Sequence, residues 1–257
     1  MLNFKNLSLL FVCTVVLLSI LRVNYAFSTW MFVLVAFLYF ILLVIGSTRI
    51  SSNFFMPVIC NQSNSGNQIA LSFDDGPALN TTGKILDILK QNQVPATFFC
   101  IGKNVKEHPV LVERIDKEGH LIGNHSYSHH FFFDLFSSSR ISEELIETNR
   151  LTRDIIHKEM RLFRPPYGVT TPNIATAVKN NKFINIGWNI RSLDTILDDQ
   201  ERILNRSLNR LKPGDIILFH DTMDVTVCIL QELIDRVRQK GFQIVRIDQL
   251  LNVRAYD

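Results

Sequence analysis

Five short polar clusters hold the residue types in this chain that can do chemistry. They contain adjacent carboxylates, two histidines four residues apart, an arginine beside two prolines, and a histidine that follows an apolar run. Carboxylates and imidazoles bind divalent metals and transfer protons near neutral pH, so their combination indicates a catalytic metal site with acid–base groups beside it. The clusters are SFDDGP (72–77), NHSYSH (124–129), FRPPYG (163–168), RSLD (191–194) and FHD (219–221).

The first two clusters have the potential to bind a metal. Asp74 and Asp75 are adjacent, and two neighbouring carboxylates repel each other unless a cation separates their roles. His125 and His129 are four residues apart, which on a helical turn places both rings on one face. One carboxylate with two imidazoles leaves coordination positions open, as in catalytic metal sites. Taken separately, the same residues also fit an Asp-rich turn and two ordinary histidines.

Two further clusters supply a fixed charge and a proton. Arg164 precedes two prolines that fix the local backbone, and its planar guanidinium could hold a carboxylate such as Asp74 through two hydrogen bonds. Without the other clusters it would be read as a surface arginine beside a rigid turn. His220 ends the apolar run IILF, where it could give or take a proton near neutral pH.

The elements that must position these clusters alternate along the chain. Each cluster directly follows a run that reads as a strand, so all five are expected at the carboxyl ends of parallel strands, where α/β folds build their active sites. The sheet is either closed into a barrel or open and doubly wound. Strands are predicted at 68–73, 96–101, 120–123, 161–163, 183–190, 215–219 and 242–247, and helices at 82–91, 105–118, 139–158, 172–180, 199–211 and 225–240.

The first 50 residues differ from the rest in composition. Residues 7–21 and 26–46 contain no charged residue, and the second run is long enough to cross a bilayer. We expect two transmembrane helices with a turn at residues 22–25; the alternative is a signal segment followed by one anchor. The predicted organisation is therefore a membrane anchor (1–50), a polar linker (51–67) and one catalytic domain (68–257).

Charge and cysteine usage exclude other classes of protein. Only three of the 27 basic residues precede residue 51, which leaves 24 against 24 acidic residues in the remainder. A neutral domain lacks the basic surface of a nucleic-acid binder. The four cysteines are scattered without a CxxC pair and indicate neither a disulfide framework nor a cysteine metal site.

Together the clusters resemble the motifs of the polysaccharide deacetylases with a NodB-homology domain, carbohydrate esterase family 4. SFDDGP is similar to the family's TFDDGP, HSYSH to H[ST]xxH, RPPY to RxPY and LFH to LxH, in the family's order over residues 68 to about 250. The resemblance implies a distorted (β/α) barrel with fewer than eight complete strands. It also implies Zn²⁺, or Co²⁺, Mn²⁺ or Ni²⁺, held by Asp75, His125 and His129.

The same resemblance implies roles for the other site residues. Asp74 would be the general base, with Arg164 orienting it, and His220 the general acid. The amide of Tyr167 would help to hold the oxyanion. One motif departs from the family's DxxDW, because this chain has RSLDT: its second aspartate, Asp194, can still tune His220, whereas the first aspartate and the tryptophan are replaced.

The expected reaction is removal of N-acetyl groups from N-acetylglucosamine units of a cell-envelope glycan, peptidoglycan or a chitin-like oligosaccharide, with release of acetate. Arg191 adds a positive charge near the site and leaves two alternatives: a silent glycan-binding protein on the same fold, or a deacylase of a different acylated sugar. Tyr167 and Trp188 could stack on the sugar, while the run FFFDLF (131–136) is expected in the core.

The expected partners are the glycan and, through the N-terminal segment, the lipid bilayer, with no nucleic acid or protein partner indicated. The resemblance places the domain outside the cytoplasm, and the apolar N-terminal segment is expected to anchor it to a plasma or inner membrane.

Overall fold

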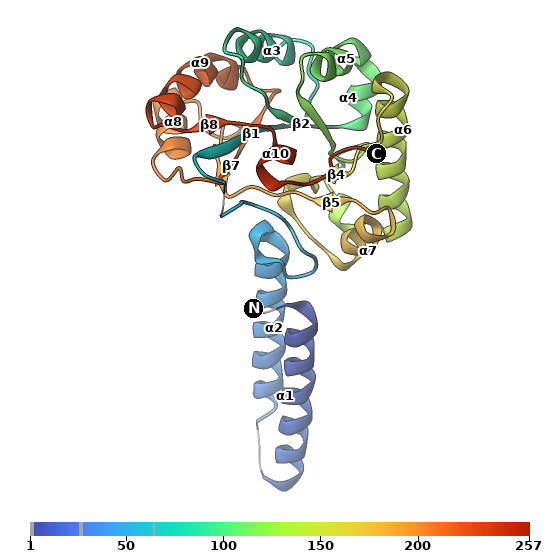
Figure 1. The fold of residues 1–257 in the computed structure, drawn as a ribbon. Helices are drawn as coiled ribbons and strands as arrows, with labels where there is room; N and C mark the ends of the chain where they lie inside the picture. Colours follow the sequence, from blue (N-terminus) through green and yellow to red (C-terminus); the bar gives the residue numbers. More distant parts are fainter. Residues whose placement is uncertain (1–2, 26–27, 64) are drawn as a thin grey trace.

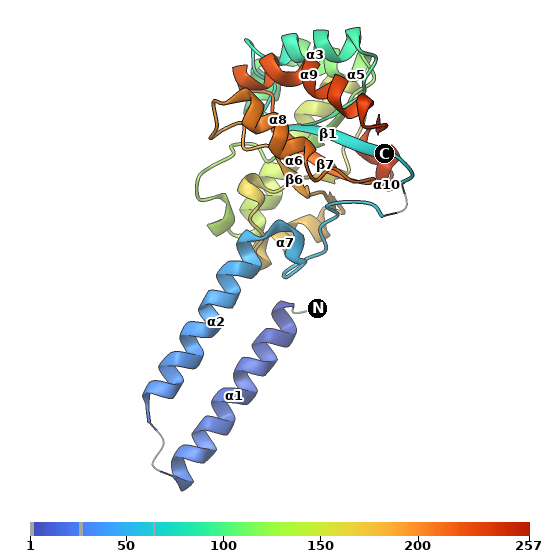
Figure 2. The ribbon, with the colours of Figure 1, turned by 90° about the vertical axis from the view of Figure 1, so that its left-hand side faces the viewer.

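A helical hairpin projects from one side of a curled α/β domain. The computed structural model describes residues 3–25, 28–63 and 65–257. Helices α1 (Phe4–Asn24) and α2 (Trp30–Thr48) lie antiparallel and form a stalk in both side views (Figures 1 and 2). By length and composition each is able to cross a membrane. The N-terminal end of α1 lies near the domain, and the tip of the hairpin lies farthest from it.

The connection between the two helices differs from the prediction. Residues 22–24, expected in the turn, are the last residues of α1. The Asn24 side chain donates to Ile20 O (2.8 Å), and the Tyr25 amide donates to Leu21 O (2.8 Å), so side-chain and backbone bonds extend the helix. Residues 26–27, assigned to the second apolar run, lie outside the described residues.

Eight parallel strands form one curled sheet. Seven follow the order β5-β4-β3-β2-β1-β7-β6, and β8 pairs with the beginning of β1. Four strands have only two residues, so the sheet is the distorted, incomplete barrel that was expected. The strands are β1 (Gln68–Asp74), β2 (Thr97–Cys100), β3 (Leu121–Asn124), β4 (Leu162–Phe163), β5 (Ile184–Asn185), β6 (Ile190–Arg191), β7 (Ile216–His220) and β8 (Gln243–Ile244).

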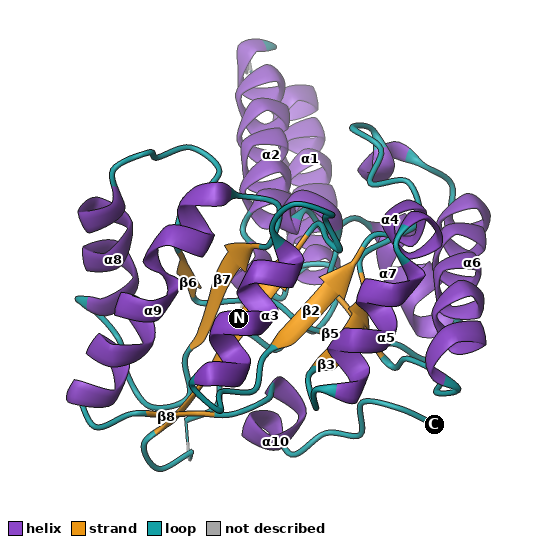
Figure 3. Ribbon diagram, turned by 90° about the horizontal axis from the view of Figure 1, so that it is seen from above, coloured by secondary structure: helices purple, strands orange, loops and turns teal. Residues whose placement is uncertain are grey.

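Helices surround the sheet, as the view from above shows (Figure 3). α10 lies at the end of the barrel opposite the arrowheads of β2 and β7, and its apolar residues close that end. The helices of the domain are α3 (Thr82–Gln91), α4 (Gly102–Glu107), α5 (Pro109–Lys117), α6 (Ser138–Ile156), α7 (Pro172–Asn180), α8 (Gln200–Leu208), α9 (Asp224–Gln239) and α10 (Ile247–Leu251), with 3₁₀ turns η1 (Ile50–Ser52), η2 (Phe133–Leu135) and η3 (Pro166–Gly168).

The central strands are apolar because both of their faces are buried. Phe73 on β1 and Phe98 on β2 stack with ring centroids 5.0 Å apart, in the core between sheet and helices. Phe99 packs on the other face, inside the barrel. Burying one such side chain stabilises the fold by about 1.5–3 kcal/mol. The central strands therefore form a rigid frame for the residues at their carboxyl ends.

Two predicted elements are each divided in the structure. The helix expected at 105–118 breaks at His108 because Pro109 lacks an N–H and disfavours helical backbone in the residue before it. The strand expected at 183–190 becomes β5 and β6. The carbonyls of Ile186 and Gly187 between them accept hydrogen bonds from Arg164 (3.4 and 2.9 Å), which directs them away from a strand ladder.

Candidate active site

The register of the sheet brings the five polar clusters to one edge. Asp74 at the end of β1 pairs with His220 at the end of β7. On the other side of β1, Asn124 pairs with Cys100 of β2 and with Phe163 of β4. The clusters line one pocket of about 230 Å³, formed by Asp74, Asp75, His125, His129, Tyr167, Gly168, Trp188, Arg191, Thr195, Leu218 and His220.

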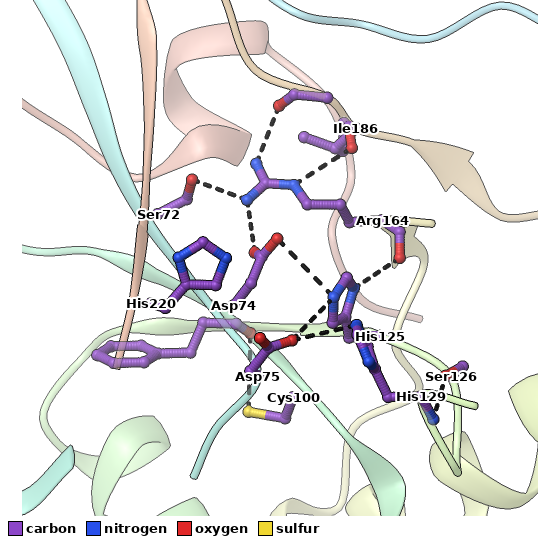
Figure 4. Close-up of polar contacts among 12 residues, drawn as sticks. Ser72, Asp74, Asp75, Cys100, His125, Ser126, His129, Arg164, Ile186 and His220 are labelled. Carbon is purple, nitrogen blue, oxygen red and sulfur yellow. Dashed lines mark hydrogen bonds and ion pairs between the residues drawn. The ribbon is translucent and has the colours of Figure 1, made fainter. Parts of the chain in front are cut away.

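One carboxylate and two imidazoles in this pocket converge at the spacing of a metal site. Asp75 Oδ1 lies 3.3 Å from His125 Nε2 and 3.3 Å from His129 Nε2 (Figure 4). This oxygen is buried and accepts no hydrogen bond from any residue that the structure describes. A buried carboxylate oxygen is costly without a partner. The three residues therefore fit a divalent cation, with coordination positions left for water or substrate.

The histidines reach this position from a loop, not from the helical turn that their spacing suggested. Ser126 (φ 63°) and His129 (φ 46°) both have left-handed backbone. Asn124 Oδ1 accepts the Ser126 amide (2.9 Å), and the Ser126 hydroxyl accepts the His129 amide (3.1 Å). His125 Nδ1 contacts Arg164 O (2.8 Å). These bonds leave Nε2 of both rings facing Asp75, which fixes the ligand nitrogens.

Charge in the pocket favours Asp75 and His129 in the protonation states of metal ligands. Burial opposes an ionised Asp75, but contact with His125 and His129 outweighs it and holds the pKa of Asp75 below its ordinary value. Burial, followed by repulsion from His125, lowers the pKa of His129 to about 4. At neutral pH the pocket therefore presents an ionised carboxylate beside the neutral His129 ring, as a metal ligand must be.

Asp74 is held by a buried arginine. Arg164 Nη1 donates to Asp74 Oδ1 (2.6 Å) and to the Ser72 hydroxyl (2.9 Å), and both charged side chains are buried. The bidentate pair that the sequence suggested is not formed, because Nε and Nη2 donate to the carbonyls of Ile186 and Gly187 (Figure 4). Asp74 Oδ2 therefore keeps free lone pairs toward the pocket, where it lies 3.9 Å from His125 Nε2.

His220 is paired with Asp194 on the other side of the pocket. Asp194 Oδ1 lies 2.8 Å from His220 Nδ1, and Oδ2 accepts the His220 amide (2.7 Å). The hydroxyls of Ser192 (2.8 Å) and Thr226 (2.7 Å) also donate to this buried carboxylate. Burial works to lower the pKa of His220, but its bond to Asp194 prevails and raises it. With Nδ1 occupied, Nε2 is the nitrogen available to a ligand.

Aromatic side chains border the pocket in two ways. Tyr167 is 46% exposed, and its ring lies 4.6 Å from that of His129, so it is available to a ligand. Trp188 is partly buried and packs against the core.

The run 131–136 was predicted to pack in the core. This prediction is confirmed for Phe133 and Phe136. It is wrong for Phe131, which is 73% exposed beside Tyr167, and for Phe132 and Leu135, which are also exposed.

The sequence interpretation missed residues that hold the carboxylate loop. Asp221 is buried behind the pocket, where Thr82 donates to its Oδ2 (2.6 Å) and burial raises its pKa to about 7. It lies so close to Gly76 that any side chain there would collide with it. Asn104 donates to Asp75 O (2.7 Å). The one available signal was the position of Asp221 directly after His220.

Sequence comparison finds relatives of this chain among known proteins. The family model for polysaccharide deacetylases matches residues 61–185. A peptidoglycan-N-acetylglucosamine deacetylase of Bacillus cereus is 34% identical over 187 residues, covering 71% of this chain and 68% of the relative. A chitooligosaccharide deacetylase of Bradyrhizobium sp. is 30% identical over 218 residues, covering 76% and 98%.

A solved structure agrees with the fold. A crystal structure of a peptidoglycan N-acetylglucosamine deacetylase superimposes with a TM-score of 0.74 at 31% identity, covering 78% of this chain and 94% of that one. The aligned share of this chain is about the size of the domain that carries the pocket.

Proposed function

Because this chain belongs to the polysaccharide deacetylase family, we propose that it hydrolyses N-acetyl groups on N-acetylglucosamine units of a cell-envelope glycan and releases acetate. Family membership makes the chain a glycan-deacetylating enzyme; the sugar and the metal dependence are the proposal. The observation that carries it is the convergence on one pocket of Asp75, His125 and His129 with two further proton-transfer groups, Asp74 and His220.

The metal ligands would be Asp75, His125 and His129, with zinc as the expected ion. A divalent cation at this position would polarise the acetyl carbonyl and lower the pKa of a water molecule. The buried, unbonded Asp75 oxygen between two imidazole nitrogens supports this assignment.

Asp74 is suited to act as the general base. Its Oδ1 is held by Arg164, and Oδ2 faces the pocket 3.9 Å from His125 Nε2. In the proposed reaction Asp74 takes a proton from the attacking water as the water oxygen bonds to the acetyl carbon. Arg164 acts through Asp74 as a positioning residue.

The remaining groups act on the oxyanion and the leaving nitrogen. The Tyr167 amide would donate to the oxygen that becomes negative in the tetrahedral intermediate. His220 Nε2 then protonates the nitrogen as the carbon–nitrogen bond breaks, which yields acetate and a free amine. Asp194 holds the ring by Nδ1 and raises the pKa of His220, which favours its protonated form. Tyr167 and Trp188 would also contact the sugar.

We further propose an organisation in which residues 1–50 anchor the chain in a plasma or inner membrane, 51–67 connect, and 68–257 form an extracytoplasmic catalytic domain. Two apolar helices of sufficient length support this. Relatives that act on peptidoglycan, a glycan of the cell envelope, support the location.

The test separates metal binding from turnover. Asp75→Ala and His125→Ala are expected to lose bound metal, whereas Asp74→Asn keeps the metal and loses about 10²- to 10⁴-fold in acetate release. Asp154→Asn, an exposed carboxylate on α6, is the control. Wild-type acetate release by Asp74→Asn would disprove the proposed base.

The substrate is tested by measuring acetate release from peptidoglycan, chitooligosaccharide and acetylated xylan side by side. N-Acetylglucosamine polymers are expected to be the better substrates. Release from xylan alone would identify a deacylase of a different sugar. Sugar binding without acetate release, even with excess metal, would identify the silent glycan-binding alternative.

A further inference from the structure

A second cavity, outside the catalytic pocket, is lined by arginines. It has a volume of about 500 Å³ and lies between β6 and α8. Four arginines and no carboxylate line it; the other lining residues are three asparagines and Ile190. We call this cavity the arginine groove, defined by Arg191, Arg202, Arg206 and Arg210.

The arginines of this groove differ from the others of the domain in their partners. Within the described part of the chain, none of the four forms an ion pair. Most other arginines of the domain do, namely Arg114, Arg150, Arg153, Arg161, Arg164, Arg236, Arg246 and Arg254. Four neighbouring guanidinium groups without a counter-charge indicate a place for an anion.

Three carboxylates near the groove in sequence have partners elsewhere. Glu201 pairs with Arg236 (2.8 Å), and Asp199 caps α8 by accepting the Arg202 amide (2.9 Å). Asp215 is buried and accepts from Asn189 and from the Lys212 amide. None of these three pairs with a groove arginine, and the exposed Asp198, four residues before Arg202, forms no ion pair in the part of the chain that the structure describes.

This arrangement has a cost that an anion would remove. Arg202 and Arg206 are four residues apart on α8, and like charges at that spacing destabilise a helix. Arg206 Nε donates to Arg191 O (2.8 Å), which fixes the edge of β6 beside the helix. The repulsion is thus built into a fixed part of the fold.

Arg191 connects the groove to the catalytic pocket. It lines both cavities, and on β6 it pairs with Leu218, two residues before His220. At its other end the groove adjoins a cavity of about 520 Å³ that shares Asn189, Ile190, Asn209 and Arg210 with it and adds Leu211, Lys212 and the buried Asp215. The positive surface therefore begins at the catalytic pocket and extends along α8, a path of about 12 Å at 1.5 Å per residue.

We propose that the arginine groove binds carboxylate or phosphate groups carried by the same glycan whose acetyl group occupies the catalytic pocket. The preferred substrate is then an acidic glycan. This inference rests on the proposed function and specifies its substrate class. The guanidinium fork matches both anions in geometry. Arg191, which stands at the first aspartate position of the family's DxxDW motif, starts the groove.

The position of the groove favours a glycan over lipid headgroups. In both side views α7, not α8, lies beside the stalk (Figures 1 and 2). The hydrogen bond between Thr170 N and Ser47 O (3.0 Å), two residues before α7 begins, places that region at the end of α2. Continuity with the catalytic pocket likewise points to the substrate.

The test compares one glycan in two charge states. The full-length, metal-loaded protein in detergent is assayed for acetate release from peptidoglycan fragments with free carboxylates and from the same fragments after amidation. The wild type is expected to show a lower KM for the free acid, a preference that shrinks as salt is added. Equal KM values for the two forms would overturn the proposal.

Single substitutions test whether the preference for the free acid comes from the arginine groove. Arg202→Gln and Arg210→Gln are each expected to reduce the free-acid preference about 1.4- to fivefold, since an exposed charge pair contributes about 0.2–1 kcal/mol. Lys240→Gln, an exposed lysine outside the groove, removes the same charge and is expected to keep the preference. A loss equal in Lys240→Gln and the groove variants would overturn the assignment.

Three additional measurements identify the source of the anion and distinguish a failure of the groove proposal from a failure of the proposed function. Because acetate, as the product, also binds the catalytic pocket, only competition that is lost in Arg202→Gln reports on the groove. If inorganic phosphate is the stronger competitor by this measure, the groove is assigned to phosphate groups; if acetate is, it is assigned to carboxylates. If Arg202→Gln weakens binding to anionic vesicles and not to glycan, the groove is a lipid site and the proposal fails. Failure of every substrate to release acetate would disprove the proposed function but not the groove. In that case the groove is still tested by comparing the binding of free and amidated fragments to Asp74→Asn.

Discussion

At the scale of single residues, the site consists of two acid–base groups that are held in opposite ways. Asp74 is held by the permanent charge of Arg164, while His220 is held by Asp194, which four hydrogen-bond donors saturate. A saturated, buried carboxylate stays ionised, so it stabilises a protonated imidazole. The protonation of His220 therefore depends on a residue that does not itself reach the pocket.

Asp194→Asn is expected to move the alkaline limit of activity. The raised pKa of His220 keeps its acid form present to higher pH, and removing the Asp194 charge lowers that pKa. The alkaline limb of the kcat/KM profile should then shift to lower pH, with a fall in kcat of about 10²-fold. Asp198→Asn, an exposed neighbour, is the control. An unchanged alkaline limb would mean that another group is the acid.

At the scale of elements, the segment before the sheet is part of the frame. Ile59 N donates to Asn185 O (3.0 Å), and Ile59 O accepts the Gly187 amide (2.8 Å), so the segment joins β5 to the turn that holds Arg164. Ile50 and Met56 pack in the core with residues of α7. The chain between α2 and the domain is therefore bonded to the same backbone that positions the general base.

Gly187→Ala is expected to disturb this contact. A Cβ at residue 187 would lie 2.6 Å from Cys60 Sγ and 3.0 Å from Val58, a collision that costs about 1–3 kcal/mol. Urea unfolding of the full chain in detergent measures the change. Cys60→Ala removes the sulfur, so the double variant should recover part of the loss. Gly83→Ala on α3, where a Cβ would make only ordinary van der Waals contacts at 3.8 Å or more, should be neutral or slightly stabilising.

The elements with local signals were predictable from the sequence. The helix at 172–180 begins at Pro172, with the Thr171 side chain accepting the Ile174 amide, a start signal that the sequence carries. The strand at 183–190 carried an equally clear apolar pattern and was divided. Arg164, about 20 residues away in the sequence, donates hydrogen bonds to two carbonyls of this segment, and no pattern within the segment indicates this.

In the site, too, the features with a signal in the local sequence were predictable and the long-range contacts were not. Asp75, His125 and His129 could be paired because parallel strands end at one edge of a sheet. The loop path of the histidines could not be predicted, since it depends on left-handed backbone at Ser126. Thr226 was missed because it reaches Asp194 from α9, with nothing in its own sequence context to indicate a partner.

At the scale of the whole molecule, His120 makes stability depend on pH. It is buried, its Nδ1 accepts the Ala96 amide (3.1 Å), and its Nε2 has no partner among the described residues. Burial lowers its pKa to about 4. An unfolded histidine titrates near 6.5, so the unfolded chain binds the extra proton first as pH falls.

The expected result is a loss of about 3 kcal/mol of unfolding free energy between pH 6.5 and pH 4, with the full contribution present above pH 6.5. Urea unfolding across this range measures it. His120→Asn should flatten the dependence, whereas His157→Asn, at an exposed left-handed position that asparagine tolerates, should leave it unchanged. Equal slopes in the two variants would contradict the assignment.

The orientation in the membrane is a second prediction at this scale. The N-terminal end of α1 lies near the domain, and the Phe4 amide donates to Phe54 O (3.0 Å), so two spans place the N-terminus and the domain on one side. A protease added to intact cells is expected to digest both an N-terminal tag and the domain. Shielding of residues 68–257 would reverse the proposed topology.

The bonded segment between α2 and the sheet limits where such an enzyme could work. Hydrogen bonds at Ser47, Ile59 and Gly187 restrict motion of the domain relative to α2, so the catalytic pocket would keep a nearly constant height above the bilayer. Its reach would then be set by the dimensions of the domain, and new substrate would be met by lateral diffusion of the anchor. Glycan lying farther out would keep its acetyl groups until it moved inward.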